Sequence, residues 1–348
     1  MEPLVLFFLT SGLFLGWALG ANDAANVFGT AVGTRMLKWR TAAIICAVFV
    51  ILGALISGAG ASHTLGKLGA ISALPGAFMT ALSAGISVFL MTKSGLPVST
   101  SQAIVGAIIG WNLFSSNPTD AGTLTKILST WIICPVLSAI IAVILLTGYK
   151  TASKYFKVHL IRADANTRIA LIAAGAFGAY SLGANNIANV VGVFIPAKPF
   201  PDLMVGSFVF SSTQQLFLLG GLAIALGVFT YSKGVMMTVG GNLGRLSSSA
   251  ALITVLSHSI VLFLFASRGL EAWLMSHGLP TIPLVPVSSS QAVVGAIVGI
   301  SILQGTAGIQ WKVLGKIVAG WVATPFAAGL LCFIGLFFLQ NVFNLKVV

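Results

Sequence analysis

Ten long runs of apolar residues constrain this chain more than any other feature of its sequence. Five begin near residues 3, 41, 70, 96 and 123, and five more begin near residues 169, 203, 250, 285 and 312, after a polar stretch from Tyr149 to Arg168. A helix needs roughly 20 apolar residues to cross the ~30 Å hydrocarbon core of a bilayer. The sequence therefore predicts an all-α integral membrane protein with about ten to twelve transmembrane segments, some of them discontinuous helices or hairpins.

The composition excludes the water-soluble classes. Of the 348 residues, 57% are hydrophobic and only 7% are charged, and the mean hydropathy is +1.03. A soluble domain carries roughly 25% charged residues, because its surface must remain hydrated. The net charge of +12 does not indicate a nucleic-acid partner, since the 18 basic residues lie scattered between apolar runs, as membrane topology produces.

The positions of Lys and Arg predict the orientation, because cytoplasmic loops are enriched in both. With the N-terminus outside, 13 of the 18 basic residues lie on the cytoplasmic side. The five left outside are Lys67, Lys126, Lys198, Arg268 and Lys346. We therefore predict a multi-pass protein of the plasma or inner membrane with both termini outside.

The number of runs also predicts the organisation of the chain. Five crossings in each half require that two similar halves lie in opposite orientations across the bilayer. We expect a first inverted repeat at residues 1–148, a basic cytoplasmic connector at 149–168 and a second inverted repeat at 169–348.

Two short motifs occur once in each half. Residues 20–33 read GANDAANVFGTAVG and residues 183–194 read GANNIANVVGVF, with seven identities in the first ten positions. Residues 97–110 read PVSTSQAIVGAIIG and residues 286–299 read PVSSSQAVVGAIVG, with eleven identities in fourteen positions. This self-similarity supports two homologous halves.

The first motif places polar side chains inside apolar runs. These residues are Asn22, Asp23, Asn26, Asn185, Asn186 and Asn189. A charged acid at the centre of a spanning helix costs at least about 2.5–3.5 kcal/mol, and Asp23 is the only acid within any predicted crossing. An isolated Asn is readily explained as a hydrogen-bonding contact between helices. The recurrence of the trio in both halves favours a binding site.

The second motif interrupts a helix. Gly95 and Pro97 in the first half, and Pro286 in the second, precede clusters of hydroxyl residues followed by Gln. A helix that begins inside the membrane has first-turn N–H groups without partners and roughly half a positive charge at its end, which makes it an anion site. An ordinary helix start with a Ser N-cap is the simpler interpretation of a single copy. The near-identical second copy favours a tetrahedral oxyanion held between two such ends.

An oxyanion cannot enter a low-dielectric site without a compensating cation. Carboxylate and amide oxygens are ligands for hard cations, and unwound backbone serves the same purpose in sodium-coupled transporters. No histidine lies within either motif to relay protons. Sodium is therefore favoured over the proton, although Asp23 itself is able to carry a proton.

These motifs resemble those of the inorganic phosphate transporter (PiT) family of cation–phosphate symporters, over essentially the whole chain. The resemblance implies a secondary transporter with inverted repeats, a homodimer in the lipid bilayer, that carries inorganic phosphate with sodium, or in some members with protons or as a metal–phosphate complex. It implies no organic cofactor. Asn186 departs from the common pattern, because many members have a second Asp there, and this departure bears on how many cations are bound.

The resemblance also implies roles for individual residues. The cation signature corresponds to Asn22, Asp23, Asn26, Asn185, Asn186 and Asn189. Phosphate is expected near Thr100, Ser101, Gln102, Ser289, Ser290 and Gln291.

Three other functions are considered beside sodium–phosphate symport. A sulfate permease would use the same oxyanion chemistry, and an anion channel would differ by not needing a gradient of a coupling ion. An intramembrane hydrolase is disfavoured, because no His or Lys is spaced to activate a motif serine. The four histidines, His63, His159, His258 and His277, form no spaced cluster, so we expect them in loops or in the core.

Overall fold

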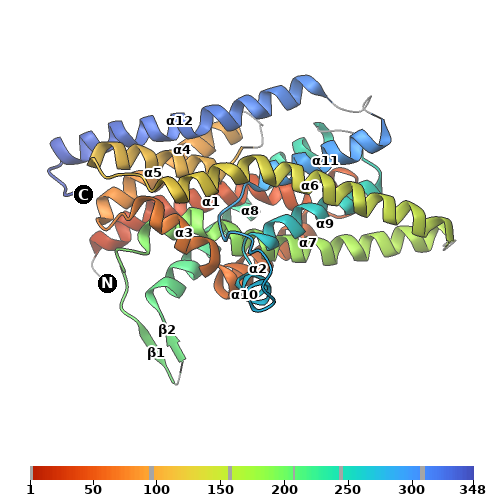
Figure 1. Cartoon of the computed structure of the whole chain (residues 1–348), viewed down its shortest axis with the longest axis horizontal. Coiled ribbons are helices and arrows are strands. Elements are labelled where there is room, and N and C mark those ends of the chain that lie inside the picture. The colour runs from red at the N-terminus through yellow and green to blue at the C-terminus, as the bar shows by residue number, and fades with distance from the viewer. Residues whose placement is uncertain (1–2, 94–97, 156–158, 207, 243–245, 306–309) are drawn as a thin grey trace.

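The computed structural model describes residues 3–93, 98–155, 159–206, 208–242, 246–305 and 310–348. The first half consists of α1 (Pro3–Gly33), α2 (Trp39–Ser57), α3 (Ala59–Gly69), α4 (Leu74–Lys93), α5 (Thr100–Ser115) and α6 (Ala121–Tyr155). The second consists of α7 (Leu160–Val191), η1 (Gly192–Phe194), β1 (Leu203–Val205), β2 (Phe208–Phe210), α8 (Ser212–Asn242), α9 (Ser248–Leu264), α10 (Arg268–Ser276), α11 (Ser289–Gln304) and α12 (Trp311–Asn341). Figure 1 shows the long helices lying roughly along one axis.

Seven of the described helices are long and apolar enough to cross a membrane, namely α1, α2, α4, α6, α7, α8 and α12. An eighth span results if α9 and α10, which meet at a 66° bend, are counted together. This is fewer than the ten to twelve segments expected. The runs near residues 96 and 285 form α5 and α11, which have 16 residues each and are about 24 Å long at 1.5 Å per residue, so each is shorter than the hydrocarbon core.

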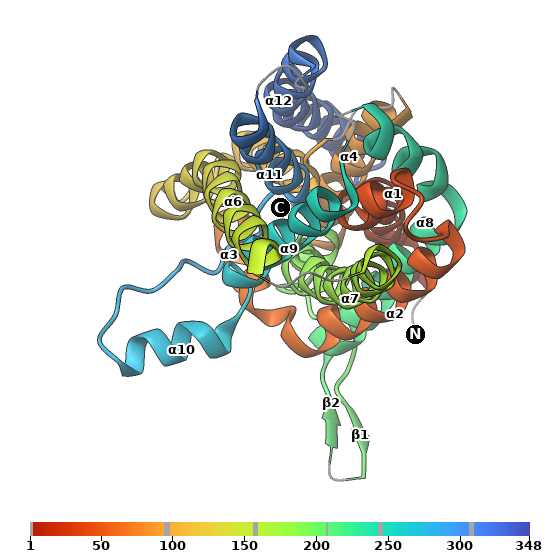
Figure 2. The same ribbon diagram turned by 90° about the vertical axis from the view of Figure 1, so that its right-hand side faces the viewer.

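The run near residue 203 also differs from the prediction. Its first residues form a small antiparallel hairpin, in which Leu203 pairs with Phe210, and α8 begins only at Ser212. Figure 2 shows this hairpin projecting away from the helices. Apart from these two short strands, the described secondary structure is helical, as predicted.

The two halves pack against each other in the same pattern. In the first half α1 packs on α4, and in the second α7 packs on α9. Across the halves, α1 packs on α8 and α7 on α2, while α5 packs on α12 and α11 on α6. In Figure 1, α6 ends at the right, whereas α12 ends at the left, beside the C-terminus. These two corresponding helices therefore run in opposite directions.

Matched glycines allow these contacts. A Cβ at Gly106 would overlap the backbone of Pro325 in α12, and a Cβ at Gly295 would overlap the backbone of Pro135 in α6. Only a residue without a side chain lets two backbones approach so closely. The same close contact between two helices therefore occurs once in each half of the repeat.

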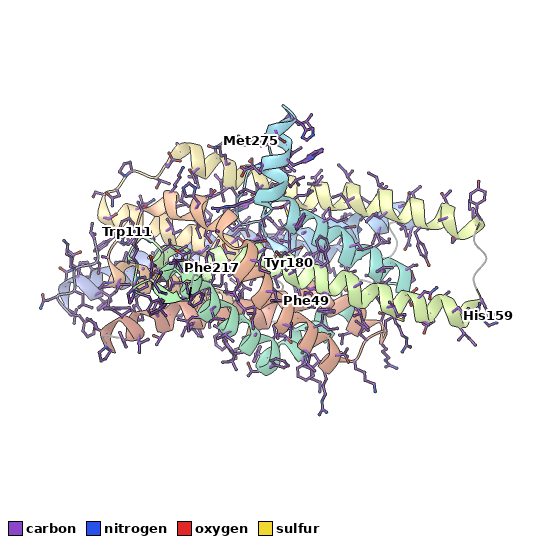
Figure 3. All side chains as sticks on the ribbon, turned by 90° about the horizontal axis from the view of Figure 1, so that it is seen from below. Phe49, Trp111, His159, Tyr180, Phe217 and Met275 are labelled. Carbon is purple, nitrogen blue, oxygen red and sulfur yellow. The ribbon has the colours of Figure 1, made fainter. Side chains whose placement is uncertain are left out.

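The chain termini and the predicted connector lie at opposite ends of the molecule. Both termini lie at one end of the long axis in Figure 1, and Figure 3 places His159 at the opposite end. Which end faces the cytoplasm stays a prediction.

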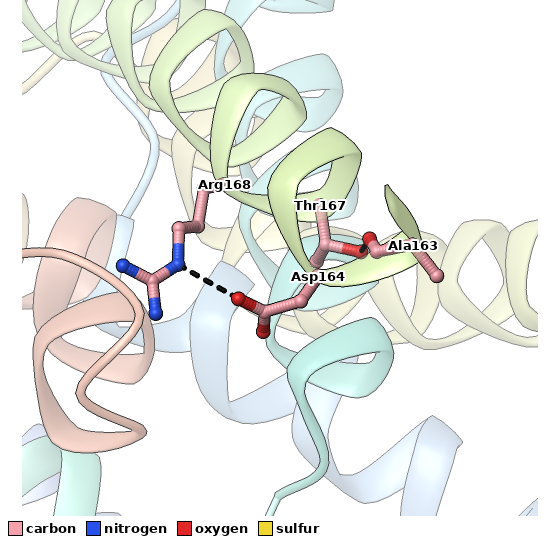
Figure 4. Close-up of polar contacts among 4 residues, drawn as sticks. All are labelled: Ala163, Asp164, Thr167 and Arg168. Carbon is pink, nitrogen blue, oxygen red and sulfur yellow. Dashed lines mark hydrogen bonds and ion pairs between the residues drawn. The ribbon is translucent and has the colours of Figure 1, made fainter. Parts of the chain in front are cut away.

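The predicted connector at 149–168 is helical at both ends, since α6 extends to Tyr155 and α7 begins at Leu160. In α7, Arg168 Nε donates to Asp164 Oδ2 at 3.0 Å (Figure 4). Both side chains are about half exposed, and pairs of this kind contribute little to stability.

Candidate substrate and ion site

The polar residues of the first motif are buried within the helix bundle. Asn22, Asp23 and Asn26, which we call the α1 triad, are at most 2% exposed. Asn22 Nδ2 donates to Thr92 Oγ1 of α4 at 3.0 Å, and Asn26 Nδ2 donates to Asp23 Oδ1 at 3.3 Å. Asp23 is the only buried carboxylate in the described part of the chain. Thr92 belongs to neither motif, so sequence reasoning missed its contact with the triad.

The corresponding residues of α7 make a different set of contacts. Asn185, Asn186 and Asn189, which we call the α7 triad, are at most 1% exposed. Asn189 Nδ2 donates to Asn186 Oδ1 at 2.8 Å and to Ser101 Oγ at 2.9 Å, and Ser101 Oγ donates to Asn186 Oδ1 at 3.4 Å. The first motif of one half therefore meets the second motif of the other half.

Asn185 fixes the irregular backbone that precedes α11. Its Nδ2 donates to the carbonyl of Val285 at 3.1 Å, and its Oδ1 accepts from the N–H of Val287 at 2.8 Å. The single proton of Ser101 Oγ is shared between Asn186 Oδ1 and the carbonyl of Val287, which is 3.0 Å away. Because both polar atoms of the Asn185 amide are engaged with this backbone, its cation role would depend on the second lone pair of Oδ1.

The second motifs begin two buried helices. Ser99 Oγ accepts from the N–H of Gln102 at 3.1 Å at the start of α5, and Ser288 Oγ accepts from the N–H of Gln291 at 3.2 Å at the start of α11. Both are N-caps, as the simpler interpretation requires, but both are also 1% exposed. Gly95 and Pro97 lie outside the described residues, whereas Pro286 is described and buried.

A buried helix start leaves N–H groups available for an anion. The first two N–H groups of each helix, those of Thr100 and Ser101 and those of Ser289 and Ser290, have no intrahelical acceptor. The N-terminal end of the helix dipole adds partial positive charge at the same place. The hydroxyl of Thr100, which has no partner among the described residues, supplies a further donor. Two such ends suit a tetrahedral oxyanion.

His258 joins this region, which the sequence did not indicate. It lies on α9, is fully buried, and its Nε2 is 2.9 Å from Ser289 Oγ. Its Nδ1 has no hydrogen-bond partner among the described residues. We expected a loop or core position for His258. Its core position holds, but its contact is with a predicted phosphate residue, and no motif spacing connects α9 with α11.

Seven buried polar atoms of the predicted cation and phosphate residues have no hydrogen-bond partner among the described residues. They are Oδ1 of Asn22, Asn26 and Asn189, Oγ1 of Thr100, Oε1 of Gln102 and Gln291, and Nδ2 of Asn186. An unsatisfied buried group costs about 1–3 kcal/mol, so such a concentration marks a place where a ligand completes the bonding. Of these atoms, Oδ1 of Asn22 and Oδ1 of Asn26 lie on the same helix as Asp23 and suit a hard cation.

These features define a class of protein. Within its described residues, this helical membrane protein buries one carboxylate, five amide side chains of the two triads and two helix N-termini, which is the design of a membrane transporter with a polar site at its interior. The enzyme alternative lacks support in this geometry, because the one histidine at the site is not part of a nucleophile arrangement with an orienting third group.

The sequence profile of the phosphate transporter family matches residues 19–331 and 274–347. The chain therefore belongs to this family, which confirms the resemblance recognised from the motifs, and it is a transporter rather than an enzyme.

Individual relatives agree with this assignment. The chain is 29% identical over 337 residues to a protein of Methanocaldococcus jannaschii assigned as a phosphate permease, with 96% of this chain and 95% of the relative covered. It is also 28% identical over 334 residues to the sulfate permease CysP of Bacillus subtilis, covering 90% of this chain and 82% of that protein. A solved structure of a sodium-dependent phosphate transporter superposes with a TM-score of 0.78 at 22% identity, covering 97% of this chain and 99% of the other, which supports the fold.

Proposed function

We propose that this protein is a secondary active transporter that couples the uptake of inorganic phosphate to sodium across the cytoplasmic membrane. The observation that carries the proposal is the contact of the α7 triad with Ser101 at the buried start of α5, in a region where several buried polar oxygens have no partner among the described residues. Phosphate as substrate is further supported by the family and by the relative assigned as a phosphate permease. Sodium coupling is supported by the fold neighbour, a sodium-dependent phosphate transporter.

Sodium would bind at the two triads. Asp23 supplies the fixed negative charge, while the unpartnered Oδ1 atoms of Asn22 and Asn26 lie on the same helix. In the α7 triad, Asn189 Oδ1 is the unpartnered oxygen, and the amide of Asn186 replaces a carboxylate. The α1 triad therefore binds the cation more strongly in this proposal, because attraction by a carboxylate exceeds that of an amide dipole.

Phosphate would bind between the starts of α5 and α11. Thr100, Ser101 and Gln102 from one helix, and Ser289, Ser290 and Gln291 from the other, supply N–H and hydroxyl donors. His258 orients the Ser289 hydroxyl through its Nε2. Because the phosphate charge and the sodium charge compensate each other, the loaded site is less costly to bury than either ion alone.

Alternating access would follow from the repeat. We propose the halves as residues 1–148 and 169–348, joined by the segment at 149–168, with both termini outside and the transporter working as a homodimer. The matched packing of α1 on α8 and α7 on α2 supports two structurally equivalent halves. Two halves of this kind are able to exchange outward-facing and inward-facing states by rocking about a fixed site.

Sulfate transport is the second candidate function, because the Bacillus subtilis relative is a sulfate permease. Sulfate is also tetrahedral but carries no proton at neutral pH, whereas phosphate has a hydroxyl that needs an acceptor. The unpartnered Oε1 atoms of Gln102 and Gln291 are such acceptors, and they favour phosphate.

Uptake of radiolabelled phosphate into proteoliposomes tests the proposal, with the sodium gradient, the proton gradient and competing sulfate varied independently. We expect uptake that requires an inward sodium gradient and that excess sulfate inhibits weakly. Uptake driven by a proton gradient alone would show that the proton, not sodium, is the coupling ion. If a divalent cation were also required, the transported species would be a metal–phosphate complex. Flux without any gradient of a coupling ion would indicate a channel.

A further inference from the structure

A cavity of about 510 Å³ lies between α3, α6, α10 and the segment that precedes α11. Its wall contains Lys67 from α3, Lys126 from α6, and Arg268 and Glu271 from α10. We call this cavity the basic vestibule. Hydroxyls of Thr64, Thr123 and Thr281 also line it.

The cations of the vestibule are not explained by topology. Only five basic residues fall on the side of the chain predicted to be outside, and three of those five line this one cavity. Cytoplasmic loops attract Lys and Arg during insertion, whereas outer loops do not. Their convergence therefore needs another reason.

These cations are available to an anion. Neither lysine forms an ion pair within the described part of the chain, and Arg268 is held in place by donating to the carbonyl of Ala59 at 2.9 Å. Glu271 is the one carboxylate in the wall. Near the cavity, a hydrogen bond from Thr123, together with Lys126 and Lys67, lowers the pKa of Asp120. Three cations thus outnumber the two nearby carboxylates.

The inner wall of the vestibule adjoins the candidate site. Leu284 and Val285 line the cavity, and Thr64 Oγ1 donates to the carbonyl of Leu284. The next carbonyl, that of Val285, accepts from Asn185 of the α7 triad. Ser288, the N-cap of α11, follows three residues later. One short piece of backbone therefore separates the vestibule from the buried polar motifs.

We propose that the basic vestibule is a peripheral binding site for tetrahedral oxyanions, which captures inorganic phosphate and supplies it to the site between α5 and α11. This inference rests on the proposed function, because it assigns the vestibule to the same substrate. A cavity in which one sign of charge predominates raises the local concentration of the opposite ion and its rate of association. Such steering weakens as salt screens the charges.

Uptake kinetics test the capture step. In the double variant Lys67→Gln/Lys126→Gln, we expect the KM for phosphate to rise by roughly tenfold at low ionic strength, with an unchanged maximal rate, because steering alters association by at least about that factor. Glu271→Gln is expected to lower KM. Choline chloride, added on both sides at a constant sodium gradient, is expected to reduce both effects.

A matched control uses the two other cations of the same side. Lys198→Gln/Lys346→Gln removes the same charge from exposed positions that do not line the vestibule, and we expect KM to stay within twofold of the wild type. An equal rise in KM in both double variants, or no rise in the vestibule variant, would overturn the inference. The phosphate of an anionic lipid headgroup has the same chemistry, so a KM effect that disappears in liposomes of zwitterionic lipid would also overturn it.

A labelling experiment keeps the test independent of transport. The three native cysteines are buried, so Thr281→Cys introduces an accessible thiol in the vestibule and Met204→Cys, at a 72% exposed position, serves as the control. We expect an anionic methanethiosulfonate reagent to react faster than a cationic one at position 281 only, and inorganic phosphate to slow that reaction. Equal reagent preference at the two positions, or no protection by phosphate, contradicts the inference. If the wild type lacks sodium-driven phosphate uptake but position 281 is protected, the proposed function fails and the vestibule site survives.

Discussion

The α1 triad and the α7 triad descend from the same motif but make opposite use of it. In the α1 triad, a carboxylate lies beside two amide oxygens that have no partners among the residues that the structure describes. In the α7 triad, Asn185 and Asn189 bond to the backbone before α11 and to Ser101 of α5. The first arrangement is built around a charge, whereas the second connects the halves. The two copies of the motif therefore differ in charge and in contacts, because Asp23 gives the α1 triad a carboxylate while Asn189 bonds the α7 triad to the other half.

The largest effect is expected from the charge that distinguishes the triads. In Asp23→Asn, loss of the carboxylate should weaken sodium binding by about 2–3 kcal/mol, roughly 30- to 150-fold, because no other buried carboxylate in the described part of the chain replaces it. The measurement is the sodium concentration that gives half-maximal phosphate uptake in proteoliposomes.

Asn189→Ala is the control for Asp23→Asn, because it removes an amide oxygen from the other triad without removing charge. We expect a much smaller change in sodium dependence. Wild-type sodium-coupled uptake by a properly inserted Asp23→Asn protein would show that the α1 triad is not the cation site.

A smaller effect is expected on the stability of the protein when the contact between the two halves at Ser101 is removed. Ser101 Oγ contacts Asn189, Asn186 and the carbonyl of Val287, whereas in the described hydrogen bonds Ser290 Oγ contacts only Ser288 Oγ. Ser101→Ala should therefore destabilise the protein by about 1–3 kcal/mol, because it leaves buried partners unsatisfied. Ser290→Ala is the matched control and should cost less.

Thermal unfolding of the two serine variants in the same detergent provides the comparison. A lower midpoint temperature for Ser101→Ala than for Ser290→Ala is the expected order. Equal midpoints would mean that the contacts of the α7 triad do not hold the halves together.

A smaller effect still is expected on the KM for phosphate when His258 is replaced. His258→Ala removes the partner of the Ser289 hydroxyl and should raise the KM for phosphate roughly fivefold, equivalent to about 1 kcal/mol for one neutral hydrogen bond. The sodium dependence should remain, because His258 contacts neither triad in the described hydrogen bonds. His258→Gln, which retains an amide able to reach a hydroxyl, is the control and should recover part of the affinity. A shift in sodium dependence instead of KM would place His258 in the coupling step.

Several of these residues were identified from the sequence because their chemistry conflicts with their surroundings. Asp23 and the Asn residues stand out in apolar runs, and burial in the structure agrees with that expectation. The Ser N-caps of α5 and α11 follow local rules of helix initiation, so their positions were predictable as well. The even number of predicted crossings places both termini on one side of the membrane, and Figure 1 shows them at one end of the molecule.

Other features were not predictable, because they depend on contacts between distant segments. His258 reaches Ser289 from another helix, and Ser101 reaches α7 across 88 positions of sequence. The number of full spans could not be counted from hydropathy, because the apolar runs near residues 96 and 285 include irregular backbone before α5 and α11, which hydropathy does not distinguish from helix. In the same way, the apolar residues at 203–210 form a hairpin whose pairing is set by a turn and not by composition.

The smallest effect is expected from making the triads alike. In Asn186→Asp, a carboxylate would retain both hydrogen bonds now accepted by Oδ1, those from Ser101 and Asn189, and would replace an Nδ2 that has no partner among the described residues. The variant should therefore fold, with a midpoint of unfolding within a few degrees of the wild type in sodium. Because a second buried charge needs a second cation, the Hill coefficient for sodium in phosphate uptake should rise while the wild type keeps the lower value.

Asn185→Asp is the contrasting control, since it would replace an Nδ2 that donates to the carbonyl of Val285 by an acceptor and should impair folding instead. If the Hill coefficient of Asn186→Asp equals that of the wild type, the amide at 186 does not limit the number of cations, and the difference between the triads lies in packing alone.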